Sequence, residues 1–170
     1  MGKAWRLPLL QTERYEFTEP TDEGIEYIAE NLREGDREEC HATLGHRRYL
    51  DALRLSVLAS DSCVMAISAY GEPVALLGVT TVSFLYNIGC PWMMGTPSAD
   101  RYKRAFIDAG RTYTQSMLGE YSSLANHVDA RNIKSVAWLQ RLGFGIEKSV
   151  PYGALGFPFH PFQIERPAHV

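Results

Sequence analysis

Hydrophobic and polar positions repeat with two different periods along this chain, and the period changes at turn residues. Apolar residues three and four positions apart predict helices, whereas short apolar runs bounded by turn residues predict strands. The strands are expected at residues 15–18, 62–69, 74–83, 91–96, 121–128, 145–150 and 159–164. The helices are expected at residues 22–34, 36–59 (broken at Gly45), 98–118 and 132–142.

Capping and turn residues set the predicted boundaries. Thr21 is positioned to cap the first helix, and Gly35 is expected to end it. Ser98 or Asp100 is expected to cap the long helix that Gly119 ends. Strands and helices in this order predict one α+β domain, a mixed α/β fold built on a single sheet.

Composition supports one domain over residues 1–170, with a short N-terminal arm (1–14) and a tail rich in Pro and Phe (151–170). The chain is 45% hydrophobic and 22% charged, typical of a globular protein rather than a disordered or fibrous one. A net charge of -3 gives no basis for nucleic-acid binding. No apolar run reaches the roughly 18 residues of a membrane span, so synthesis in the cytoplasm is expected.

Charge is concentrated near the N-terminus. Residues 12–39 contain eleven acids and three arginines, a net charge of -8. This segment is interpreted as a solvated helical face, and an acidic edge that meets a basic partner is the alternative.

Three cysteines, an odd number, do not suggest a disulfide framework. Cys40 and His41, with His46 nearby, are residue types that bind zinc, but a structural zinc site needs four ligands and no second pair follows. No metal is therefore expected.

The segment from Asn132 to Phe144 resembles the end of the GCN5-related N-acetyltransferase (GNAT) fold, where a helix opened by Asn closes on a Gly-Phe pair. The order of predicted elements resembles that fold over most of the chain. The resemblance implies a central mixed sheet of about six to seven strands flanked by about four helices. It also implies acetyl-CoA as the donor, should the protein be an active enzyme.

Residues 29–36, 138–144 and 151–157 also resemble small phage proteins related to the internal virion protein of short-tailed phages. This resemblance implies a virion-associated structural or assembly protein, located in the virion after synthesis in the host cytoplasm. Its partners would be other virion proteins, with homo-oligomers as a further possibility.

Two departures from the GNAT pattern argue against catalysis. GNAT enzymes bind the coenzyme diphosphate on a glycine-rich loop after the fourth strand. Here that place contains only Gly95, Pro97 removes a backbone donor, and Asp100 adds a negative charge. The position of the Tyr that acts as general acid in many GNAT enzymes is Leu139 by register from Asn132. These departures favour a protein-binding module with no cofactor and no catalytic residues.

The alternative is an active acetyl-CoA-dependent N-acetyltransferase, with a coenzyme-sized cleft between the fourth and fifth strands and backbone N–H groups pointing into it. Candidate catalytic residues are then Glu120, His127 and Asp129, although a lone His on a strand is more often structural. Candidate cofactor-binding residues are Gly95, Arg101 and Asn132.

Aromatic residues suggest contact surfaces, because aromatics are enriched at interface centres. The candidates are Tyr86, Trp92, Phe157, Phe159 and Phe162. Core packing is the other interpretation of the aromatic cluster around Tyr86 and Trp92. Prolines in the tail predict an edge strand or an irregular extension.

Overall fold

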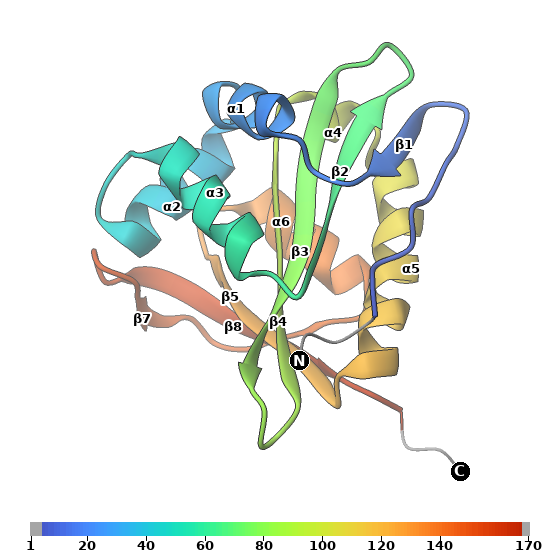
Figure 1. The fold of residues 1–170 in the computed structure, drawn as a ribbon. Helices are drawn as coiled ribbons and strands as arrows, with labels where there is room; N and C mark the ends of the chain where they lie inside the picture. The colour runs from blue at the N-terminus through green and yellow to red at the C-terminus, as the bar shows by residue number, and fades with distance from the viewer. Residues whose placement is uncertain (1–4, 168–170) are drawn as a thin grey trace.

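One mixed sheet organises the chain in the computed structural model, which describes residues 5–167 (Figure 1). In the described chain its strands follow the order β1-β2-β3-β4-β5-β8-β6, and β7 also pairs with β8. The strands are β1 (Tyr15–Thr18), β2 (Ser62–Ser68), β3 (Pro73–Ser83), β4 (Ile88–Gly95), β5 (Ser123–Asp129), β6 (Gly145–Ile146), β7 (Val150–Tyr152) and β8 (Phe157–Glu165). The helices are α1 (Asp22–Glu30), α2 (Glu34–Leu44), α3 (Tyr49–Ala59), α4 (Ser98–Arg101), α5 (Lys103–Glu120) and α6 (Ile133–Arg141).

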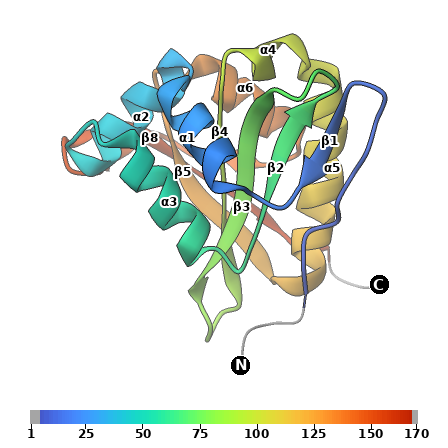
Figure 2. The same cartoon turned by 45° about the horizontal axis from the view of Figure 1, so that its top comes forward.

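Helices cover both faces of the sheet, as expected for this class of fold (Figures 1 and 2). On one face, α1 and α3 bury a small core against β2 and β3, which includes Ile28, Leu53 and Met65. On the other face, α5 and α6 cover a larger core that includes Tyr113 and Leu124. The mixed α/β fold is confirmed, and the described residues form more strands than the six or seven expected and more helices than four.

The ends of the first helices follow local chemistry in two cases and depart from it in a third. The Thr21 side chain accepts a hydrogen bond from the Gly24 N–H (3.1 Å), which confirms the predicted cap. Gly45 ends α2 in the left-handed conformation with φ 75°, which confirms the break predicted there. The prediction for Gly35 was wrong: α1 ends at Glu30, and Gly35 lies in the first turn of α2. A Cβ there would lie 3.0 Å from Asn132 Oδ1, so the glycine allows close approach.

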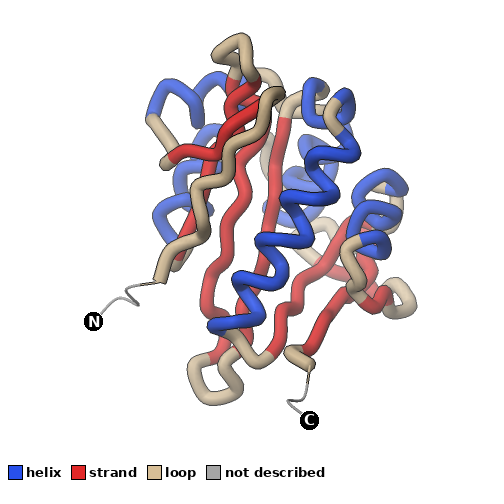
Figure 3. The backbone as a smooth tube through the Cα atoms, turned by 90° about the vertical axis from the view of Figure 1, so that its right-hand side faces the viewer, coloured by secondary structure: helices blue, strands red, loops and turns tan. Residues whose placement is uncertain are grey.

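Strands β4 and β5 are the only parallel neighbours in the described sheet, and their pairing is short. It covers Ile88 with Ser123 and Gly89 with Leu124, after which the strands separate. Figure 3 shows β5 and β8 diverging from the remaining strands, with α5 lying across the sheet. Beyond the paired residues, the Asn126 side chain bridges the gap by donating Nδ2–H to the Pro91 carbonyl (2.9 Å). The sheet is therefore open where β4 and β5 end.

The C-terminal tail forms an interior strand, so the expected edge strand or irregular extension was wrong. β8 pairs with β5 on one side and with β6 and β7 on the other. Pro161 is tolerated there because the neighbouring strand is interrupted between Ile146 and Val150. The Pro161 carbonyl accepts the Glu147 N–H (2.8 Å) on that side, so the missing proline N–H faces the interruption.

Burial revises the predicted contact surfaces. Phe159 and Phe162 are 1% and 5% exposed and belong to the core, so their assignment as interface residues was wrong. Trp92 is partly buried and donates its Nε1–H to Ser60 Oγ (2.9 Å). Tyr86 is exposed on the turn between β3 and β4, and Phe157 is 38% exposed beneath the Arg131 guanidinium. Only these last two remain candidates for contact with a partner.

The turn between β7 and β8 docks onto the end of α2. The N–H groups of Ala154 and Leu155 donate to the carbonyls of Thr43 and Ala42 (2.9 and 3.1 Å). These carbonyls have no partner within the helix, because the last turn of any helix leaves its acceptors free. The contact joins the far end of the sheet to the helices on one face.

Gly153 in this turn is predicted to tolerate no side chain. Its φ is 73°, and a Cβ would lie 2.7 Å from both the Ala42 carbonyl oxygen and the Thr43 Cα. Gly153→Ala is expected to lower the free energy of unfolding by about 2–4 kcal/mol, because backbone strain adds to a clash with backbone atoms. Gly156→Ala is the matched control, since its φ is 63° with no atom within 4 Å. It should cost only about 1 kcal/mol. Equal losses in urea unfolding would contradict the docking.

Candidate functional site

A cavity of about 880 Å³ lies where β4 and β5 separate, within the range of about 300–1,000 Å³ typical of small-molecule sites. Its walls come from both faces of the sheet. On one face they include residues of α2 and α3, and on the other residues of α5 and α6. The cleft predicted for an active acetyltransferase, between the fourth and fifth strands, is therefore present.

The free edge of β4 lines this opening with backbone groups. The Pro91 carbonyl and the Gly95 N–H both point away from β3, towards Asn126 and Asp36 respectively. Because successive residues of a strand point their polar groups to opposite edges, the N–H and C=O of Met93 lie on the same edge as the Pro91 carbonyl and the Gly95 N–H. In the described sheet, β5 pairs with β4 only at Ile88 and Gly89, so the edge of β4 at Met93 is left for a ligand.

Helix α2 places a carboxyl group on the cavity wall. Glu39 Oε2 accepts hydrogen bonds from Asn132 Nδ2–H (3.2 Å) and the Asp129 N–H (3.4 Å). Burial raises the pKa of Glu39 to about 7, and the negative charge of Asp36 adds to the rise. The two hydrogen bonds oppose it without cancelling it. Glu39 therefore exchanges a proton near neutral pH, as a general base must.

His127 and Tyr152 form another part of the wall. Their rings are stacked, with centroids 4.0 Å apart and planes 7° apart, and both residues line the cavity. Burial lowers the pKa of His127, while the charge of Glu147 acts in the opposite direction. The imidazole is therefore largely neutral at physiological pH.

The wall formed by α5 and α6 is mainly apolar, with one unmatched donor. Leu139, Leu142 and Met117 line it together with Trp138. The Trp138 Nε1–H is buried and has no hydrogen-bond partner in the described chain. A buried donor without an acceptor costs about 1–3 kcal/mol.

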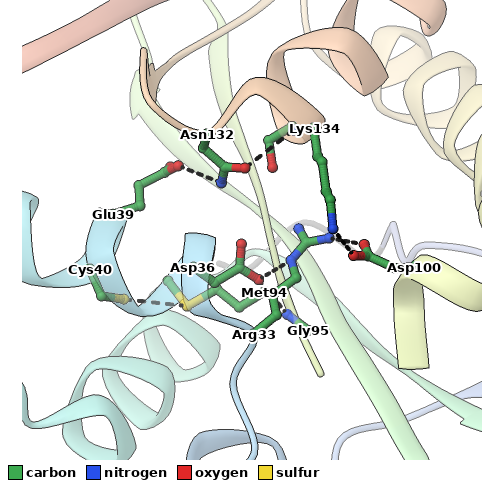
Figure 4. A network of polar contacts seen from close by, with 10 residues as sticks. Arg33, Asp36, Glu39, Cys40, Met94, Gly95, Asp100, Asn132 and Lys134 are labelled. Carbon is green, nitrogen blue, oxygen red and sulfur yellow. Dashed lines mark hydrogen bonds and ion pairs between the residues drawn. The ribbon is translucent and has the colours of Figure 1, made fainter. Parts of the chain in front are cut away.

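An ion network closes the end of the cleft beyond β4 (Figure 4). Asp36 accepts from Arg33 Nε–H (2.8 Å) and from the Gly95 N–H (2.8 Å). Asp100 binds both Arg33 Nη1 (3.3 Å) and Lys134 Nζ (2.6 Å). Burial acts to raise the pKa of Asp100, but the hydrogen bond from Lys134 and the charge of Arg33 together hold it below its usual range.

The loop after β4 does not form a diphosphate cradle. Thr96, Ala99 and Asp100 donate their N–H groups to backbone carbonyls, and the Gly95 N–H is bound to Asp36. Pro97 has no N–H to offer. The expected caps at Ser98 or Asp100 were wrong: Pro97 precedes α4, Tyr102 precedes α5, and Asp100 forms ion pairs instead. The N–H groups of Gly95, Thr96, Ala99 and Asp100 are therefore already bound within the chain and not free to hold a diphosphate.

The structure separates the residues singled out in the sequence. His127 lines the cavity, whereas Asp129 is buried in a bidentate pair with Arg131 and Glu120 lies at the other end of β5. Asn132 caps α6 and positions Glu39, and Gly95 belongs to the Asp36 network. Arg101 is exposed and lines neither cavity found in the described chain.

Glu39, Trp138 and Tyr152 were missed by sequence reasoning. Glu39 ends the acidic segment 12–39, which was interpreted as a solvated face, and nothing local distinguishes it from Glu38. Tyr152 lies outside α6, where the tyrosine of many GNAT enzymes would be expected. It lies in β7, which brings it to the cavity wall beside His127. Trp138 fits the apolar stripe of its helix and gave no separate signal.

The described residues were also considered as metal ligands and as membrane-spanning helices. Among residues 5–167, no three His, Cys, Asp or Glu side chains are grouped to hold a metal ion. Cys40 Sγ lies instead 3.7 Å from Met94 Sδ. Over the same described range, no helix combines the length and the hydropathy of a membrane span.

Glu39→Gln is predicted to change how stability depends on pH. Because the folded protein holds the Glu39 proton up to about pH 7 whereas the ordinary pKa is 4.5, wild-type stability should fall as pH rises between these values. The variant lacks this loss, so its free energy of unfolding relative to wild type should increase by about 2–3 kcal/mol from about pH 4 to about pH 8. Glu38→Gln, a surface residue paired with Arg47, is the control and should show no such trend. A pH-independent difference for Glu39→Gln in urea unfolding would contradict the raised pKa.

No protein-family model and no curated protein sequence matches the chain. Solved structures do. A GNAT-family acetyltransferase from Bacillus anthracis has a TM-score of 0.68 at 12% identity, with 94% of this chain and 99% of that chain covered. Spermidine N-acetyltransferase from Vibrio cholerae, in complex with CoA and spermine, has a TM-score of 0.66 at 13% identity, with 91% and 97% covered. Ribosomal-protein-S5-alanine acetyltransferase from Vibrio fischeri has a TM-score of 0.65 at 14% identity, with 95% and 98% covered.

Identities this low establish architecture and not activity. None of the comparisons supports the resemblance to phage virion proteins. The architecture agrees with these neighbours over nearly the whole chain, and the protein therefore has the GNAT fold.

Proposed function

We propose that this protein is an N-acyltransferase that moves an acyl group from a thioester in the β4–β5 cleft to an amine. One observation carries the proposal: the cavity passes between the separated strands and has on its wall a carboxyl group with a pKa near neutrality. A cavity that served only packing would not need an ionisable side chain held at that pKa. The GNAT neighbours support acyl transfer more than a purely structural role.

The residues of the cleft suit the removal of a proton from the amine and the attack of the amine on the thioester. Glu39 accepts a proton from the amine, whose nitrogen then attacks the thioester carbonyl. The C–N bond forms as the C–S bond breaks, and the products are an amide and a thiol. Asn132 and the Asp129 N–H orient the Glu39 carboxyl group for this step.

The arm that carries the thioester has a polar partner on the edge of β4. The Met93 N–H lies on this free edge. It is suited to a carbonyl oxygen of an extended, amide-containing arm, which would lie beside β4 like an added strand.

Leu139 occupies the position where many GNAT enzymes place a Tyr, and it cannot donate a proton. A thiol ionises near pH 8.5 in water, so the leaving sulfur can depart as a thiolate and take its proton from solvent. The reaction therefore proceeds without a general acid at this position, at some cost in rate.

The second candidate is a non-catalytic binding module, as the sequence analysis favoured. The observation on its side is the loop after β4, whose N–H groups are bound within the chain. Virion association, virion localisation and binding to virion proteins stay predictions of sequence resemblance. Homo-oligomerisation stays a prediction too, although a spermidine N-acetyltransferase among the neighbours, at 13% identity, is dodecameric.

The acyltransferase proposal predicts thioester-dependent acylation of amines. Purified protein is incubated with acetyl-CoA or S-acetylpantetheine and a panel of amines (spermidine, lysine and an N-terminal alanine peptide), and both thiol release and the acylated product are measured. The rate should rise as pH increases through about 7, because Glu39 must lose its proton. Glu39→Gln should reduce the rate about 100-fold or more, and Glu38→Gln should not.

No acylated product with either donor, from protein that melts cooperatively, would refute the proposal and favour the binding module. A Glu39→Gln rate equal to wild type would remove Glu39 from the mechanism.

Trp138→Phe tests the unmatched donor in the cavity wall. The variant should be as stable as wild type or more so, because the removed N–H is buried and has no partner in the described chain. Trp92→Phe is the matched control, since the Trp92 Nε1–H donates to Ser60 Oγ, and this variant should be less stable by about 1 kcal/mol. A clear loss of stability for Trp138→Phe in urea unfolding would show that its N–H is bound in the folded protein.

A further inference from the structure

The place where a diphosphate would bind is already occupied by an anion of the chain itself. The Asp36 carboxylate accepts the Gly95 N–H, the first donor after β4, at 2.8 Å. The same oxygen, Oδ2, accepts Arg33 Nε–H at 2.8 Å, and Asp36 is only 5% exposed. A phosphate at this point would have to displace a buried, paired carboxylate or lie beside it, and like charges in a low-dielectric site repel strongly.

Three further donors of this region are also used. The N–H groups of Thr96, Ala99 and Asp100 bind the carbonyls of Val74, Thr96 and Pro97, and Pro97 itself has none. A helix N-terminus binds phosphate through N–H groups that are free to point at it. Here these three N–H groups are already bound to carbonyls of the chain.

The nearby cations, Arg33 and Lys134, are also paired with a carboxylate of the chain. Asp100 lies between Arg33 (3.3 Å) and Lys134 (2.6 Å), and joins α4 to the start of α6 (Figure 4). Lys134 and Arg33 would have to leave Asp100 before they could neutralise a diphosphate. The smaller cavity at this end, about 390 Å³, is lined by carboxylates and cations together, among them Glu34, Glu38 and Arg131, and has no excess of positive charge.

We infer that the donor for this cleft is an acyl group on a pantetheine arm that lacks the adenosine diphosphate of coenzyme A. The inference rests on the proposed acyl transfer and specifies its donor. A pantetheine arm carries amides and a thioester, is uncharged, and places all its polar groups within the β4–β5 gap. The gap offers such an arm the edge of β4 at Met93, and the ion network closes the gap beyond Gly95.

The chemistry of the transfer is unchanged by this choice of donor. The acyl carbon exchanges its bond to the pantetheine sulfur for a bond to the amine nitrogen, and Glu39 takes the amine proton. The nucleotide takes no part in bond making, so its loss removes binding contacts only.

The test compares three donors on the wild-type protein: S-acetylpantetheine, S-acetyl-4′-phosphopantetheine and acetyl-CoA. Dissociation constants are measured by calorimetry at low and at physiological salt, with 3′,5′-ADP as a competitor. The expected result is that acetyl-CoA binds no more than about threefold tighter than S-acetylpantetheine, and that 3′,5′-ADP does not compete. Comparison of the first two donors shows whether a single phosphate is accepted.

Asp100→Asn provides a second measurement. Removal of this carboxylate frees Arg33 and Lys134, so the affinity for acetyl-CoA should improve several-fold while that for S-acetylpantetheine stays constant. Asp108→Asn is the matched control, because it makes the same change in net charge on an exposed part of α5. It should leave the ratio of the two affinities as in wild type.

Acetyl-CoA binding tenfold or more tighter than S-acetylpantetheine, with competition by 3′,5′-ADP, would overturn the inference and leave the proposed acyl transfer standing. Arg101 at the end of α4 and Lys103 and Arg104 at the start of α5, all exposed, would then be the phosphate contacts, and the excess affinity would fall with salt. Binding of none of the three donors would overturn the acyl-transfer proposal itself.

Discussion

The separation of two parallel strands determines most of what is distinctive in this protein. β4 and β5 share hydrogen bonds at only two residues each, and then diverge. Strand edges without partners are costly when buried, because every N–H and C=O needs a hydrogen bond. The chain meets part of this need itself, through Asn126 on Pro91 and Asp36 on Gly95, and leaves the stretch between them open to the cavity. The fold thus keeps the gap between β4 and β5 open, and a side chain binds the backbone of β4 at each end of it.

Three carboxyl groups around this opening show how burial and pairing act against each other. Burial raises the pKa of Asp36, while the charge of Arg33 and the hydrogen bonds from Arg33 and the Gly95 N–H act in the opposite direction. Asp100 lies between two cations, which hold its pKa low. Glu39 has hydrogen bonds from an amide side chain and a backbone N–H but no cation, and its pKa rises to about 7. Of the three, Glu39 alone has no cation in its hydrogen-bond set, and it is the group proposed to exchange a proton.

The departures from the usual enzyme pattern therefore have two different consequences. Leu139 removes one proton donor, which a thiolate leaving group can do without. The loop after β4 changes what the cleft is able to bind, because its donors are bound within the chain. Because the cavity is retained and has Glu39 on its wall, the changed loop after β4 favours a different acyl donor over a loss of acyl transfer.

Local pattern determined much of the architecture: the cap at Thr21, the break at Gly45, the hairpin of β2 and β3, and the helix from Asn132 that ends on Gly143 and Phe144 all follow from residues close in sequence. It also identified the loop after β4 as a departure from the GNAT pattern. The tertiary structure alone decided that β8 is interior, since Pro161 fits only where the neighbouring strand is interrupted. It alone brought Glu39, His127, Tyr152 and Trp138 to one cavity. The physical reason is that burial and long-range pairing set both a strand's neighbours and a carboxyl group's pKa, and neither is encoded within a few residues.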